Sequence, residues 1–194
     1  MNQWIEDRGQ PINNCGKLIL AQEENLDDQI DMLHKRATEN GVITQIVDAL
    51  QINEIESKAR SASGRGLWSP NTSVTDPKKI LNELERILKL RKVSFMYKSV
   101  IAEINTSKRF IKLLSGQRIE YGYLFNCAGL FALNIAKHMN SGLDYELIPF
   151  KGNYWKIKNR KACDIQTNVY PVPDLSMPFL GIHFSPDAYN KTLN

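Results

Sequence analysis

The chain has few of the residues that build metal centres and disulfide frameworks. Its 194 residues include only three histidines and three cysteines, which are Cys15, Cys127 and Cys163. The cysteine count is odd and the spacing matches no metal-ligand pattern, so we expect neither a metal site nor a disulfide scaffold. Free cysteines in such a chain indicate a reducing, intracellular compartment.

Long hydrophobic runs and long charged blocks are also missing. No apolar stretch reaches transmembrane length, and Met1 is followed by the polar residues NQWIEDRGQ rather than by a signal segment. The 25 basic and 21 acidic residues give a net charge of +4 and are dispersed along the chain. We therefore expect a cytoplasmic protein without a nucleic-acid partner.

Apolar spacing predicts a strand and three helices in the first 90 residues. After the strand at residues 16–22, Asn25 and Asp28 resemble a capping box for a helix that Gly41 closes. A second, shorter helix is predicted over residues 46–55. The Ser-, Gly- and Asn-rich residues 57–75 are typical of a surface loop. A third helix is expected to begin at Thr75 or Asp76, with Pro77 in its first turn.

From residue 93 onward the apolar period is two, which predicts strands. Three short strands with turn residues between them form a predicted β-meander, at residues 100–104, 110–114 and 118–121. A buried strand at residues 123–127 is expected to follow. Residues 145–184 are predicted to be rich in strands that prolines interrupt.

The predicted strand at residues 123–127 leads directly into an amphipathic helix through Cys127, Ala128 and Gly129. A strand that turns on small residues into a helix presents free backbone N–H groups to an anion. The same turn also occurs where a strand merely packs on a helix. The spacing alone leaves both interpretations open.

Four segments in this order resemble the FAD-dependent oxidoreductases of the D-amino-acid oxidase superfamily, and most of all the L-2-hydroxyglutarate dehydrogenase/oxidase branch. They are GKLILAQ (residues 16–22), CAGL (127–130), PFKGNYW (149–155) and YPVPDLSMPFLGIHF (170–184). The branch has GKLIVA, NCAGL, P-x-RGEYY and YPVPDP-x-PFLGVHFT. Lys151, Asn153 and Ser185 stand where the branch has Arg, Glu and Thr.

The superfamily begins with a strand, a G-x-G-x-x-G turn and a helix that holds the FAD pyrophosphate. The only Gly-rich candidate, at residues 63–66, has no hydrophobic strand before it. The resemblance implies an α/β fold: a partial FAD-binding domain that lacks the N-terminal Rossmann unit, interleaved with an antiparallel-sheet substrate domain. Residues 72–142 would belong to the former, and residues 15–71 and 143–184 to the latter. We expect the middle part of a longer enzyme.

Residue by residue, the resemblance places FAD contacts on two segments. Cys127, Ala128 and Gly129 match the turn that approaches the FAD phosphates and ribose. Val100 matches the position whose backbone meets the adenine, although it is equally well explained as a residue of a sheet core.

Flavin dehydrogenases transfer a hydride to the flavin while a base removes the hydroxyl proton. His183 lies in the best-matching segment and is the candidate for that base, or else a structural histidine. The candidate substrate contacts are Lys151, Tyr154 and Tyr170, which offer a cation and hydroxyl donors to a dicarboxylate. Lysine lacks the bidentate fork of arginine, so Lys151 should recognise a planar carboxylate less well.

The resemblance thus implies oxidation of a small 2-hydroxy acid, such as L-2-hydroxyglutarate, with FAD as cofactor. An amine- or polyol-oxidising relative and a non-catalytic remnant that binds no cofactor are the alternatives. Members of this family often pass electrons to a membrane acceptor, which leaves peripheral contact with the inner face of a membrane open. Without a Rossmann unit beside it, the strand at residues 123–127 would leave an exposed sheet edge, so we expect self-association.

Overall fold

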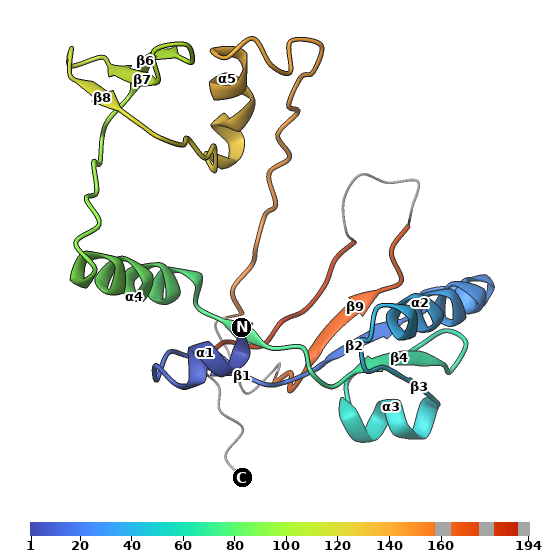
Figure 1. Cartoon of the computed structure of the whole chain (residues 1–194). Helices are drawn as coiled ribbons and strands as arrows, with labels where there is room; N and C mark the ends of the chain where they lie inside the picture. The colour runs from blue at the N-terminus through green and yellow to red at the C-terminus, as the bar shows by residue number, and fades with distance from the viewer. Residues whose placement is uncertain (158–163, 175–180, 190–194) are drawn as a thin grey trace. The chain divides into compact units, whose positions relative to one another are not determined.

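The computed structural model describes residues 1–157, 164–174 and 181–189, and in it the chain forms two compact units (Figure 1). Met1–Arg91 and Ile157–Asn194 form the first unit, and Lys92–Lys156 form the second.

A four-stranded mixed sheet is the centre of the first unit. It contains β3 (Gln45–Val47), β4 (Gly66–Ser69), β2 (Lys17–Leu20) and β9 (Asn168–Pro171), in that order. The pairs β3–β4 and β4–β2 are antiparallel, whereas β2 and β9 are parallel. The predicted α/β class is confirmed, and the expected antiparallel sheet is in fact mixed because a strand from the C-terminal part joins it.

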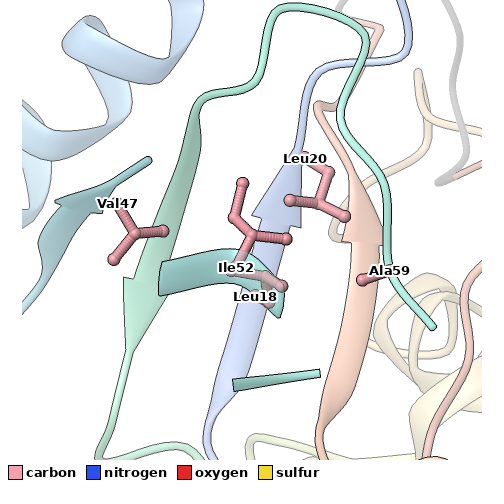
Figure 2. Packing of buried hydrophobic residues seen from close by; sticks show 5 residues of the cluster. All are labelled: Leu18, Leu20, Val47, Ile52 and Ala59. Atoms are coloured by element: carbon pink, nitrogen blue, oxygen red, sulfur yellow. The ribbon is translucent and has the colours of Figure 1, made fainter. Parts of the chain in front are cut away.

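Two helices cover opposite faces of this sheet, α2 (Asp27–Glu39) and α3 (Ala49–Ile55) (Figure 1). On the α3 side, Leu18, Leu20, Val47, Ile52 and Ala59 form one buried cluster (Figure 2). On the α2 side a second cluster contains Ala21, Ile30, Leu67 and Val172. Successive residues of a strand face opposite sides, so β2 supplies both cores.

Further elements complete the first unit. They are α1 (Asn2–Glu6), β1 (Ile12–Asn13), a 3₁₀ turn at Glu24–Leu26, β5 (Val74–Thr75), which pairs with β1, and α4 (Pro77–Leu90). Helix α4 begins as predicted, with Asp76 as its N-cap and Pro77 in its first turn. No helix in residues 1–157, 164–174 and 181–189 is long and apolar enough to cross a membrane.

The second unit consists of the predicted meander and a short helical segment. Strands β6 (Ile101–Asn105), β7 (Phe110–Leu113) and β8 (Arg118–Glu120) form an antiparallel sheet around buried Ile104, Phe110 and Leu113. A 3₁₀ turn (Gly129–Phe131) and α5 (Ala132–Lys137) follow.

Three predictions for the first unit need correction. The N-cap of α2 is Leu26 and no side chain caps it, so Asn25 and Asp28 form no capping box. The predicted helix at 46–55 begins only at Ala49, because Ile46 and Val47 pair with β4 as a strand. The predicted loop at 57–75 contains β4. This strand is buried on both faces, so its sequence lacks the alternation of apolar and polar residues that would have predicted a strand.

The strand predicted at residues 123–127 is wrong. These residues form no strand, and Tyr123 and Phe125 are 89% and 84% exposed. An apolar run becomes a buried strand only when neighbouring strands take its backbone N–H and C=O groups, and no described residue does so here. Residues 145–184 also hold fewer strands than predicted, with β9 the only one in their described part.

Candidate functional site

Tyr170 and His183 come together at the outer edge of the mixed sheet. Val169 of β9 exchanges two backbone hydrogen bonds of 2.9 Å with Phe184, which lies antiparallel to it. The next residues along, Tyr170 and His183, stack their rings with centroids 4.4 Å apart and planes 19° apart. The Nδ1 atom of His183 also lies 3.3 Å from the carbonyl oxygen of Gly181. Two predicted site residues from one matched segment are therefore neighbours.

Lys17 of β2 joins this pair from the other side of β9. Its Nζ lies 5.7 Å from the centroid of the Tyr170 ring, within the range of a cation–π contact. Lys17 and Ile19 share one face of β2, and Ile19 is paired with Tyr170. Lys17 was not among the residues predicted from the sequence. The signal that could have found it is its charge, because the other residues of its strand, Leu18, Ile19 and Leu20, are apolar.

The residues before Lys17 are held firmly. Asn168, which is buried, donates from Nδ2 to the carbonyl oxygen of Gly16 (2.7 Å) and to Cys15 Sγ (3.2 Å). Burial raises the pKa of the Cys15 thiol. The backbone of Gly16 has φ +69°, and a Cβ at this position would lie 2.0 Å from the Trp68 ring. The start of β2, and with it the base of Lys17, is thus fixed by close packing.

A buried carboxylate holds the chain that leads into β9. Glu56 is 2% exposed, and its Oε2 accepts a 2.7 Å hydrogen bond from the backbone N–H of Gln166. Its Oε1 accepts a bond of 3.2 Å from Lys58 N–H. Because an unpaired buried carboxylate is costly, these bonds tie the entry to β9 to the end of α3. Tyr170 therefore lies on a strand that is fixed at its start by Glu56 and along its length by pairing with β2.

In the second unit, the predicted cofactor turn is open to solvent. Cys127 is exposed, and Gly129 has φ +55° with nothing within 4 Å of where its Cβ would lie. The N–H of Ala128 donates a long, 3.4 Å hydrogen bond to Asn126 Oδ1, and the Ala128 carbonyl accepts from Phe131 N–H at 3.0 Å. Helix α5 has only six residues, so its macrodipole is too short to make a strong anion site.

The other predicted site residues also lie in the second unit. Val100 is 58% exposed, and its carbonyl oxygen accepts from Leu114 N–H at 2.9 Å as part of the meander. Lys151 is exposed. Tyr154 is exposed too, and its ring lies beside Gly152, 3.2 Å from where a Cβ of that residue would be. The structure thus joins Tyr170 to His183, and it places the remaining candidates in a separate unit.

Comparison with known proteins identifies the family. Residues 1–193 match the family of FAD dependent oxidoreductases. The chain belongs to this family.

The chain is similar to proteins named L-2-hydroxyglutarate dehydrogenase. It is 32% identical over 184 residues to the mitochondrial protein of Caenorhabditis briggsae, covering 91% of this chain and 42% of the relative. It is 30% identical to the mitochondrial protein of Mus musculus over 95% of this chain and 42% of the relative. For the Escherichia coli K12 protein the identity is 24%, over 94% of this chain and 43% of the relative. The chain thus spans less than half the length of these relatives.

The fold is similar to that of a solved structure, the L-proline dehydrogenase from P. horikoshii. The TM-score is 0.70 at 16% sequence identity, over 88% of this chain and 46% of that one. At this identity the likeness shows a shared fold and no more.

The described helices do not fit the pyrophosphate of FAD. Such a group needs the free N–H groups of a helix N-terminus. Helix α2 begins with Asp27 and Asp28, and the first N–H groups of α3 and α4 already bond the side chains of Asp48 and Asp76. At α3 and α4 the carboxylates occupy the donors, and at all three N-termini their negative charge repels phosphate. Within the described part of the chain, the open turn at Cys127 offers at most an edge contact with the cofactor.

Proposed function

We propose that this chain carries substrate-side residues of an FAD-dependent dehydrogenase or oxidase of small 2-hydroxy acids, such as L-2-hydroxyglutarate. The observation that carries the proposal is the 32% identity to an L-2-hydroxyglutarate dehydrogenase over 91% of this chain. The stacked Tyr170 and His183 support it, because they lie in the same matched segment and meet at the sheet edge.

In this proposal His183 accepts the proton of the substrate hydroxyl. Imidazole changes charge near neutral pH, and a ring held by stacking is presented in one orientation. Tyr170 supplies that stacking surface and a hydroxyl donor. Lys151 and Tyr154 are proposed as further substrate contacts on the basis of the resemblance.

The cofactor would be FAD, which supplies the hydride-accepting group of this family when bound. We assign Val100, Cys127, Ala128 and Gly129 to its edge contacts and assign the pyrophosphate to no described residue. Residues 72–142 are the proposed cofactor part, and residues 15–71 and 143–184 the proposed substrate part. Consequently the 194-residue chain alone should bind FAD weakly.

A non-catalytic protein that binds no cofactor is the second candidate. The carboxylates at the starts of α2, α3 and α4 favour it, because those at α3 and α4 occupy the first N–H groups and those at α2 place negative charge at its uncapped N-terminus. It predicts that neither FAD nor a hydroxy acid binds.

Ligand binding followed at the histidine side chains separates these candidates. The chain has three histidines, so their ring signals in NMR can be assigned with His183→Gln and His34→Gln variants. L-2-hydroxyglutarate should shift the His183 signal and leave the His34 signal in place. A larger shift with an amino acid or a polyol phosphate would favour an amine- or polyol-oxidising enzyme. If no compound shifts the His183 signal, the non-catalytic protein is the better description.

A further inference from the structure

We propose that Lys17, Tyr170 and His183 form a carboxylate-binding site on one face of the sheet, with Lys17 as its cation. This inference rests on the proposed function, because it names the substrate carboxylate as the ligand. It adds Lys17 to the proposed substrate contacts, and it places the cation on β2.

Three adjacent segments build the site. Lys17 comes from β2, Tyr170 from the parallel strand β9, and His183 from the segment that bridges the outer edge of β9. The phenol ring lies between the other two side chains, 5.7 Å from the ammonium nitrogen and 4.4 Å from the imidazole centroid. The three groups thus offer a positive charge, a hydroxyl donor and an imidazole nitrogen to one small ligand.

Among the described residues, Lys17 forms no ion pair, and its ammonium contacts only the ring of Tyr170. In residues 1–157, 164–174 and 181–189, six ion pairs occupy other basic residues, namely Arg65 (twice), Arg86, Lys89, Arg118 and Lys137. In the described ranges no carboxylate lies within 4.0 Å of the Lys17 ammonium, and no hydrogen bond of its Nζ is found there. The Lys17 side chain is only partly exposed. A partly desolvated cation beside an aromatic ring attracts an anion more strongly than one in bulk water.

The ligand class follows from the donors. Ammonium and hydroxyl groups form charge-assisted hydrogen bonds with carboxylate oxygens. An imidazole beside them is placed to exchange a proton with a hydroxyl on the neighbouring carbon. A 2-hydroxy acid carries its carboxylate and its hydroxyl on adjacent atoms, so it matches this set of groups.

Charge removal at Lys17 tests the site. Titration of the 194-residue chain with L-2-hydroxyglutarate, by calorimetry and by the His183 NMR signal, gives the Kd. Lys17→Met should raise the Kd by about 10-fold or more, the loss expected for one charge-assisted hydrogen bond. Lys17→Arg should restore most of the affinity. The matched control is Lys35→Met, which removes one charge from the exposed face of α2; Lys151→Met tests the cation that the resemblance points to.

The outcomes separate this inference from the proposed function. If L-2-hydroxyglutarate binds and Lys17→Met has no larger effect than Lys35→Met, the site is wrong and the proposed function stands. If Lys17→Met weakens the binding of glutarate as well, and L-2-hydroxyglutarate binds no more tightly than glutarate, the carboxylate site stands and the proposed function fails. If no carboxylate shifts the His183 signal, both are overturned. Circular dichroism of each variant shows that it has folded.

Discussion

Replacing Gly16 by alanine should destabilise the first unit far more than the same change at Gly41. Both glycines have φ +69°, so each substitution carries the same backbone strain, about 1–2 kcal/mol for a left-handed residue with a Cβ. At Gly41 nothing lies within 4 Å of the new Cβ, whereas at Gly16 it would lie 2.0 Å from the Trp68 ring. Trp68 packs against the core cluster of Leu18 and its neighbours, so the ring cannot swing away freely.

Forcing atoms into a packed core costs about 1–3 kcal/mol. Gly16→Ala should therefore lower the free energy of unfolding by about 2–5 kcal/mol, and Gly41→Ala by about 1–2 kcal/mol. Urea unfolding followed by far-ultraviolet circular dichroism measures both. In a Trp68→Leu background the clash with the ring is removed, so Gly16→Ala should lower the free energy of unfolding only by the backbone strain of about 1–2 kcal/mol. Losses for Gly16→Ala and Gly41→Ala that agree within about 0.5 kcal/mol would refute the packing argument.

Three further results are expected. Mixed with FAD and then separated by gel filtration, the purified chain should carry little flavin absorbance, and a stoichiometric yellow protein would show that a pyrophosphate site exists. Glu56→Gln should cost about 1–3 kcal/mol by weakening two buried hydrogen bonds, while the exposed Glu54→Gln should cost almost nothing in the same thermal melt. The Tyr189 hydroxyl holds the pKa of Asp76 below its ordinary value of 3.8. This hydrogen bond therefore stabilises the fold above pH 3.8, and the stabilisation is lost as the pH falls through the lowered pKa. Because Tyr189→Phe removes the hydrogen bond, acid unfolding of the variant should begin at higher pH.

Local patterns in the sequence predicted the elements whose cause is local. Helix α4 was predicted from Asp76 and Pro77, which act within its own first turn. The meander was predicted because each of its strands pairs with the next across a short turn. Gly41 was predicted to end α2, and it takes the left-handed conformation just after the helix.

Elements with distant partners were harder to predict. Strand β4 is buried on both faces between β2 and β3, so its sequence GLWS shows no alternation and resembles part of a loop. Residues 123–127 show the opposite error, since an apolar run was interpreted as a strand although nothing described pairs with it. Whether such a run becomes a strand is decided by its neighbours in space.

The candidate site divides in the same way. Tyr170 and His183 were predicted from one contiguous segment, YPVPDLSMPFLGIHF, and the structure stacks them. Lys17 was not predicted, because it reaches Tyr170 only through a parallel pairing of β2 with β9 across some 150 residues of sequence. Residue roles, unlike the fold, stay predictions until ligand binding is measured.

The last expectation concerns helix α4, which has an apolar face that no described residue buries. Its apolar residues fall on one side of the helix at positions 80, 81, 84, 87 and 88, and none of its residues is buried. An exposed stripe of this kind is typical of an interface. We therefore expect the chain to self-associate through α4 rather than through the sheet edge that the sequence suggested. Leu84→Glu should shift light-scattering mass toward the monomer and reduce hydrophobic-dye binding, whereas Leu50→Glu, at an exposed leucine on α3, should not. A wild-type chain that is already a monodisperse monomer without dye binding would show that α4 is covered in solution.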